Sequence, residues 1–318
     1  MKMNRVQFHP GLSMPEFFER YATEAQCRAA LEAARWLKGF VCGKCGGAAR
    51  TRFERAGLPY WQCRGCGGQC SLIAGTIFES SKRGLRPWFL AMQLLTLAKN
   101  NVSALELMRQ LGVSYRSAWL IKHKIMQAMR LREDGRELDG RIELDDAYLG
   151  GELPGGKPGR GSENKVPFIA AVQTTPQGHP VLACLRQQPH TQQEVAVFAA
   201  RHIAPSATVV SDGLRCFTAT TLVGAEHERH VTGGGKDSVK LPQFRAVNTP
   251  LGNLKTATSG TYYAFDFAKY AHRYLAEFQY RFNRRFDMKS ILSRLLTALA
   301  VATPSPEHAI RAAAEVSR

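Results

Sequence analysis

The segment Arg141-Ile-Glu-Leu-Asp-Asp-Ala-Tyr-Leu149 decides the fold predicted for the second half of the chain. Apolar and acidic residues alternate along it, and Gly150-Gly151 follows, which is the pattern of a β-strand. Similar patterns predict four further strands, and Thr191 with Glu194 forms the capping box of a helix at 192–203. The four strands are expected at residues 166–174, 180–185, 207–211 and 228–232.

The resulting order of strand, strand, strand, helix, strand, strand and helix predicts an RNase H-like domain over residues 138–290. Such a domain is a mixed five-stranded sheet with helices on its faces. Asp145 lies in the middle of the first strand, and Asp212 lies at the carboxyl end of the fourth. If these two strands are neighbours, both carboxylates meet at one end of the sheet.

Two carboxylates at that place suit a pair of Mg²⁺ or Mn²⁺ ions roughly 3.5–4 Å apart, which activate one phosphate oxygen and stabilise another. Mg²⁺ takes oxygen ligands and keeps waters and substrate phosphates in its shell. Asp146 directly follows Asp145 and therefore points to the opposite face of the strand. We expect Asp146 to support the site by hydrogen bonding and not to bind the metal.

The eight cysteines of the chain include two Cys-x-x-Cys pairs, Cys42 with Cys45 and Cys63 with Cys66. Each pair presents two thiolates on a tight turn, and two pairs supply the four ligands of a tetrahedral Zn²⁺ site. Because four thiolates fill the coordination shell, the predicted zinc ribbon has a structural role. A redox-active Cys-x-x-Cys is the alternative, and Cys70 is the candidate for a substitute ligand.

Helical periodicity flanks the ribbon. Ser103 with Glu106, and then Ser114, begin two helices joined by Leu-Gly-Val-Ser, which predicts a helix-turn-helix. The fold class is therefore a multidomain α+β or α/β protein, with a zinc ribbon and a helix-turn-helix before the RNase H-like catalytic domain. The predicted parts are a helical segment at 1–38, the ribbon at 39–82, the helix-turn-helix region at 83–137, the catalytic domain at 138–290 and a C-terminal helical tail at 291–318.

The chain has 43 Lys and Arg against 26 Asp and Glu, a formal charge of +17 that indicates a polyanionic partner. No apolar run reaches the roughly 18 residues that span a membrane, and the N-terminus lacks the apolar stretch of a signal peptide. We therefore expect a cytoplasmic protein that binds double-stranded DNA. The candidate DNA contacts are Arg116, Lys122 and Lys124 of the second predicted helix, and Arg284 and Arg285 of the last long helix. An ordinary helical hairpin and a solvated charged face are the competing interpretations.

Together these motifs resemble insertion-sequence transposases of the ISXO-two-like group, and the resemblance covers nearly the whole chain. Besides the ribbon, the helix-turn-helix and the block around Asp145, it rests on residues 159–165, 211–213, 247–249, 252–255, 260–262 and 274–285. The resemblance implies a DDE-type catalyst that binds terminal inverted repeats, cuts transposon ends and joins the freed 3′-hydroxyls to target DNA. It also implies a homo-oligomer on DNA and a bacterial, nucleoid-associated location.

Carried over by motif, the first two acidic positions of the family fall on Asp145 and Asp212. The resemblance also implies that Lys255 is a cation that binds DNA phosphate near the scissile bond.

The third acidic position, counted back from Lys255, falls on Asn248. Because Asn offers a neutral carbonyl oxygen, the site would hold its metal ions with one negative charge less. Asn253 and Glu277 are the alternatives for this ligand. The Asn at this position is compatible with an active transposase. It is also compatible with a catalytically inactive DNA-binding regulator that derives from a transposase, and a zinc-ribbon transcription factor is a third interpretation.

Overall fold

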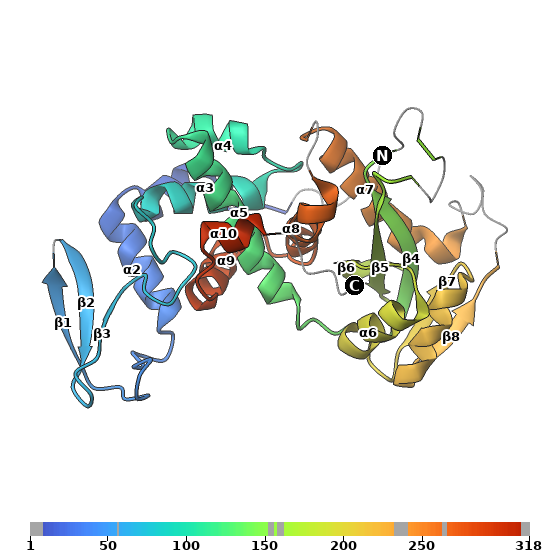
Figure 1. Cartoon of the computed structure of the whole chain (residues 1–318), viewed down its shortest axis with the longest axis horizontal. Helices are drawn as coiled ribbons and strands as arrows, with labels where there is room; N and C mark the ends of the chain where they lie inside the picture. Colours follow the sequence, from blue (N-terminus) through green and yellow to red (C-terminus); the bar gives the residue numbers. More distant parts are fainter. Residues whose placement is uncertain are drawn as a thin grey trace. The chain divides into compact units, whose positions relative to one another are not determined.

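The computed structural model describes residues 9–55, 57–151, 156–157, 162–231, 241–262 and 266–312. The chain divides into two compact units (Figure 1). The first unit contains the described parts of Met1–Ala98, Ala104–Ala128 and Phe286–Ile310, and the second contains those of Lys99–Ser103, Met129–Arg285 and Arg311–Arg318. Residue 232 of the fifth predicted strand, residues 159–161 of the family motifs, and the outer ends of the predicted segments 1–38 and 291–318 lie outside the described residues.

A five-stranded mixed sheet forms the centre of the second unit, in the strand order β6-β5-β4-β7-β8. The strands β4, β5 and β6 pair antiparallel, whereas β7 pairs parallel to both β4 and β8. All five predicted strands are present, with shifts of a few residues at their ends. Their bounds are β4 Arg141–Leu149, β5 Val166–Thr174, β6 Pro180–Gln187, β7 Thr208–Ser211 and β8 Glu226–Arg229.

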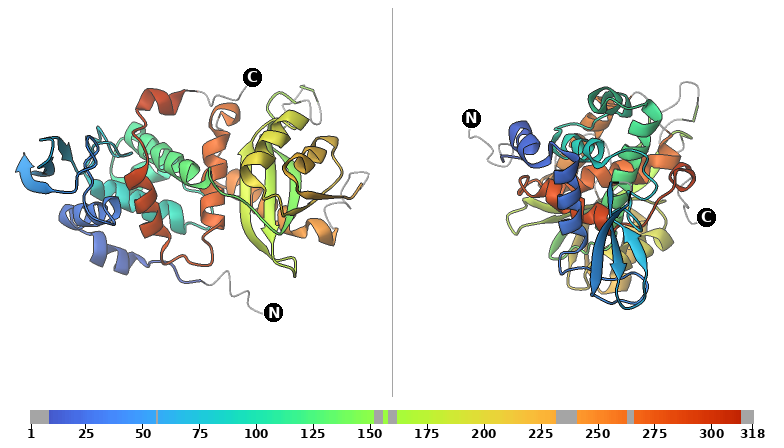
Figure 2. Two further views of the ribbon diagram at one scale, coloured as in Figure 1. Left: turned by 90° about the horizontal axis from the view of Figure 1, so that it is seen from below. Right: turned by 90° about the vertical axis from the view of Figure 1, so that its left-hand side faces the viewer.

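Helices cover both faces of this sheet because side chains alternate along β4. Ile142 and Leu144 pack into one apolar cluster with the helix α6 (Gln192–His202) and the 3₁₀ helix η3 (Arg215–Val223). Ala147 and Leu149 pack on the other face with α7 (Arg245–Ser259) and α8 (Phe267–Phe282). In Figure 2 the orange α8 and the yellow α6 accordingly lie on opposite sides of the sheet.

In the first unit, the predicted N-terminal helical segment consists of two helices, α1 (Met14–Tyr21) and α2 (Glu24–Arg35). The chain breaks between them because Thr23 starts a new helix with a full capping box to Gln26. The helix α2 packs against α3 (Leu85–Leu97) and also against α9 (Ile291–Val301), so this C-terminal helix belongs to the first unit.

A three-stranded antiparallel sheet follows α2 in sequence and carries the cysteine pairs. Its strands are β1 (Arg50–Arg55), β2 (Leu58–Cys63) and β3 (Gln69–Ser71). We call residues 40–71 the ribbon.

Two helices then follow in the place of the predicted helix-turn-helix, α4 (Ala104–Leu111) and α5 (Tyr115–Glu133). Gly112 between them has a φ of 62°, a left-handed conformation that glycine adopts without strain. A short helix, α10 (Glu307–Arg311), ends the described part of the chain. Among the described residues, no helix combines the length and apolar character needed to cross a membrane.

Candidate active site

Three aspartates gather in the second unit, where the pairing of β4 with β7 ends. The last register pair between β4 and β7 is Leu144 with Ser211, so Asp145 and Asp212 each stand one residue beyond it. A carboxylate oxygen from each of Asp145, Asp146 and Asp212 lies within 4.8 Å of the others. The structure thus brings Asp145 and Asp212 together, as parallel pairing of the two strands requires.

The carboxylate of Asp146 lies closer to the other two than its place on the strand indicates. Strand alternation does put it on the α6 face of β4, opposite to Asp145, but its carboxylate still reaches the other two. The reason is that β7 ends at Ser211, so β4 has no parallel neighbour beyond Leu144 and the side chains of both faces approach one another at its open edge. Asp146 is therefore close enough to serve as a ligand.

The cluster is electrostatically unfavourable without a counter-charge. Burial first, and then the negative charges of Asp146 and Asp212, raise the pKa of Asp145 to about 7, while the backbone amide of Asp146 and the charge of Lys255 oppose the shift. A divalent cation relieves both the desolvation and the repulsion, because carboxylate oxygens are the ligands that Mg²⁺ and Mn²⁺ prefer. The donor set therefore fits a divalent metal ion.

Asp145 and Asp146 line a pocket of about 460 Å³ in the second unit. Asn248 and Lys255 both face it from α7, one helical turn from Gly252 and Leu251 respectively. The lining residues are Asp145, Asp146, Ala147, Tyr148, Gly150, Lys165, Asn248, Leu251, Gly252 and Lys255.

Of the three candidates for the third ligand, Asn248 alone lines this pocket. Glu277 is completely buried in α8 and accepts a hydrogen bond from the hydroxyl of Tyr262 at 3.5 Å. The start of α7, which carries Asn248, is held by Glu143 of β4, whose buried carboxylate accepts a hydrogen bond from the amide of Val247 at 2.8 Å.

Sequence reasoning did not assign a role to Lys165 or Glu143. Lys165 belongs to the segment 159–165, which carries the family resemblance, and it directly precedes β5. Its place in the pocket depends on the path of the chain before that strand. Glu143 stands two residues before Asp145 and therefore on the same face of β4. This spacing is the feature of the sequence that indicates a place for Glu143 near the site.

The four predicted zinc ligands form one cluster in the ribbon, with a sulfur from each of Cys42, Cys45, Cys63 and Cys66 within 4.8 Å of the others. Two similar turns hold these cysteines. In the first turn the amide of Gly46 donates to the carbonyl of Cys42, and in the second the amide of Gly67 donates to the carbonyl of Cys63. Backbone amides, first that of Lys44, lower the pKa of Cys42 to about 6, which favours the thiolate that zinc binds. The cluster fits a structural zinc ion, and Cys70 is not part of it.

The prediction that Lys122 and Lys124 contact DNA is wrong. Their exposed fractions are 1 % and 6 %, and the ammonium of Lys124 donates to the carbonyl of Ile77 at 3.2 Å. The physical reason is that α5 is buried on all sides from residue 121 to residue 126, so its basic residues do not form an exposed face. Arg116, in the first turn of α5, is exposed and pairs with Glu307 at 2.8 Å.

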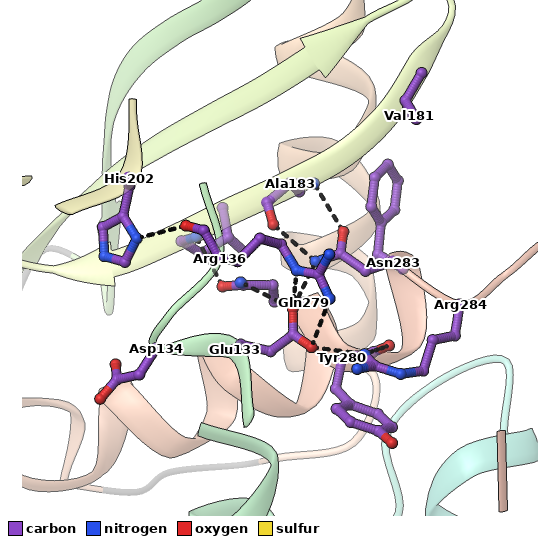
Figure 3. Close-up of polar contacts among 12 residues, drawn as sticks. Glu133, Asp134, Arg136, Val181, Ala183, His202, Gln279, Tyr280, Asn283 and Arg284 are labelled. Carbon is purple, nitrogen blue, oxygen red and sulfur yellow. Dashed lines mark hydrogen bonds and ion pairs between the residues drawn. The ribbon is translucent and has the colours of Figure 1, made fainter. Parts of the chain in front are cut away.

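Arg284 is also buried, so its predicted DNA contact is wrong as well. Figure 3 shows the reason, which is a network around the fully buried Glu133 at the end of α5. The guanidinium of Arg284 donates to this carboxylate at 2.6 Å, and Arg136 and Asn283 donate to it at 2.8 Å each. Arg285 is half-buried and donates to the carbonyls of residues 180, 181 and 282, so most of its donors are used within the protein.

A four-cysteine ribbon in one unit and a cluster of three carboxylates on the central sheet of the other define a zinc-ribbon protein with a second, oxygen-rich group of side chains that fits a divalent metal ion. Residues 137–283 match the ISXO2-like transposase domain, and residues 22–69 match the transposase zinc-ribbon domain. A protein of the transposable element ISH50 of Halobacterium salinarum is 26 % identical over 213 residues, which cover 62 % of this chain and 70 % of that protein. The chain belongs to the ISXO2-like transposase family of insertion sequences.

Proposed function

We propose that this protein is an active DNA transposase, a DDE-type enzyme with the pattern Asp-Asp-Asn, and that its second unit is an RNase H-like catalytic domain. The observation that carries the proposal is the meeting of the carboxylates of Asp145 and Asp212, with oxygen atoms within 4.8 Å of each other, beside a pocket that Asp145 and Asn248 line. The strand order, with β4 in the centre of a mixed sheet, supports the same fold.

In this proposal Asp145, Asp212 and the amide oxygen of Asn248 hold two Mg²⁺ or Mn²⁺ ions, and Asp146 supplies a further oxygen. When bound, these ions lower the pKa of an attacking water or 3′-hydroxyl and stabilise the leaving oxygen. Lys255 and Lys165 line the same pocket, and their positive charges hold the DNA phosphate against the carboxylates.

The exposed face of the ribbon is the best-supported surface for DNA. The ribbon has five Lys or Arg and one acidic residue, Glu54. One face of the ribbon buries Trp61 against Trp36, with ring centroids 4.6 Å apart. The opposite face carries the stacked pair Phe53 and Tyr60 and the guanidinium of Arg55, 5.4 Å from the Tyr60 ring.

Arginines beside half-buried aromatic rings are suited to phosphates and to the sugar edges of a DNA groove. In the helix-turn-helix of α4 and α5, the exposed first turn of α5 with Arg116 is a further surface for DNA binding. We expect the first unit to bind terminal inverted repeats as part of a homo-oligomer on DNA, because two transposon ends must be processed together.

The test is strand cleavage of a labelled transposon end with its flanking DNA, in the presence of Mg²⁺ or Mn²⁺. We expect cleavage and strand transfer by the parent protein, and their loss with retained DNA binding in Asp145→Ala and Asp212→Ala. Glu137→Ala, which removes an exposed carboxylate shortly before β4, is the matched control and should cleave normally. DNA binding without any cleavage by the parent protein would instead identify a regulator derived from a transposase.

A further inference from the structure

His190 lies directly behind the carboxylate cluster, in the connection between β6 and α6. Its Nδ1 atom is 3.8 Å from a carboxylate oxygen of Asp146 and 3.2 Å from the hydroxyl of Tyr148. Its Nε2 atom is 3.0 Å from the carbonyl oxygen of Phe168 in β5. The imidazole therefore connects Phe168 of β5 with Asp146 and Tyr148 of β4, beside the point where the aspartates meet.

The orientation of this ring is determined by its hydrogen bonds. A carbonyl oxygen can only accept, so Nε2 carries the proton of the bond to Phe168. Nδ1 consequently faces the hydroxyl of Tyr148 and the carboxylate of Asp146. The ring of Tyr148 meets the imidazole edge to face, with centroids 5.1 Å apart, which further restricts its rotation.

Asp146 depends on this arrangement more than Asp145 does. Both Asp146 and Tyr148 stand on the α6 face of β4, whereas Asp145 stands on the face that α7 covers. The side chains of Asp146 and His190 are only 5 % and 8 % exposed, so each fills space that the other would otherwise enter. Without the imidazole, the Asp146 carboxylate has room to turn away from the cluster.

We propose that His190, assisted by Tyr148, is a positioning residue that holds the carboxylate of Asp146 toward Asp145 and Asp212. The proposal rests on the divalent-metal site of the proposed function, and assigns a residue that does not touch the metal. Residues that orient metal ligands in this way typically change metal affinity by about 10–100-fold when removed.

The direct test is a Mn²⁺ titration of the zinc-loaded, full-length protein without DNA, followed by calorimetry or by electron paramagnetic resonance. We expect His190→Ala to weaken Mn²⁺ binding about 10-fold or more. His190→Asn should recover part of the loss, because its amide reaches the place of Nδ1. Tyr148→Phe removes a single oxygen and should weaken binding by a smaller factor. His179→Ala, at an exposed histidine, is the matched control and should bind as the parent does.

Two further measurements separate this proposal from the rest of the account. Asp146→Asn should weaken Mn²⁺ binding at least as much as His190→Ala, and an unchanged affinity in either variant overturns the positioning role. A parent protein that binds no Mn²⁺ overturns the metal site together with it. If the parent binds Mn²⁺ and cleaves no DNA, the proposed function fails, but the Mn²⁺ affinities of the variants still test the role of His190. The melting temperature of each variant without Mn²⁺ shows whether it has folded.

Discussion

Replacing Asp145 by Asn should stabilise the metal-free protein at alkaline pH. Burial, together with the charges of Asp146 and Asp212, raises the pKa of Asp145 from its ordinary 3.8 to about 7. At roughly 1.36 kcal/mol per pKa unit, the ionised carboxylate costs the folded state up to about 4 kcal/mol. Because a buried amide also loses some hydration, we expect the free energy of unfolding to rise by about 2–4 kcal/mol at pH 8.

The pH dependence has a definite sign. The Asp145 carboxyl binds its proton more tightly in the folded protein than in the unfolded chain, so the cost is absent below pH 3.8, where both states are protonated. It grows as the pH rises and reaches its full size above pH 7. The difference in stability between Asp145→Asn and the parent should therefore widen from acid to alkaline pH.

Scanning calorimetry is the suitable assay, because all four tryptophans belong to the first unit and fluorescence would not report on the second. Saturating Mg²⁺ should raise the melting temperature of the second unit in the parent, since a ligand of the folded state stabilises it, and should do so much less in Asp145→Asn. Equal stability of the two proteins at pH 8 without metal, or equal stabilisation by Mg²⁺, would refute the reasoning.

Three further changes test other parts of the structure. Cys63→Ser should leave less than one zinc per chain by metal analysis and should unfold the ribbon, whereas a full zinc content would exclude the four-cysteine site. Glu133→Ala leaves Arg284 buried without its carboxylate and should lower the free energy of unfolding by about 3–5 kcal/mol in urea denaturation; a loss below about 1 kcal/mol would contradict the role of this network. Asn248→Ala should abolish strand cleavage while Asn253→Ala retains most of it, and the reverse result would reject Asn248 as the third ligand.

Much of the second unit could be predicted from the sequence because its signals are local. Alternation along β4 and the N-cap bond from the Glu194 amide to the Thr191 hydroxyl at the start of α6 each involve a few neighbouring residues. The meeting of Asp145 and Asp212 required one further assumption, that their strands are neighbours, and the parallel register of β4 and β7 satisfies it.

The wrong predictions concern residues whose surroundings come from distant parts of the chain. Lys122 and Lys124 have the spacing of a basic helix face, but the elements packed around α5 bury that face. Arg284 is held by Glu133, 151 residues away in sequence. His190 carries no local pattern that distinguishes it from a surface histidine, and only the approach of β4 and β5 gives it a role.

The most direct test of the account is an anomalous diffraction map from crystals of the protein soaked in Mn²⁺. We predict a strong Mn²⁺ peak between the carboxylates of Asp145 and Asp212, within bonding distance of an oxygen from each. Crystals that contain Mn²⁺ only at other sites, with these two side chains directed away from each other, would contradict it.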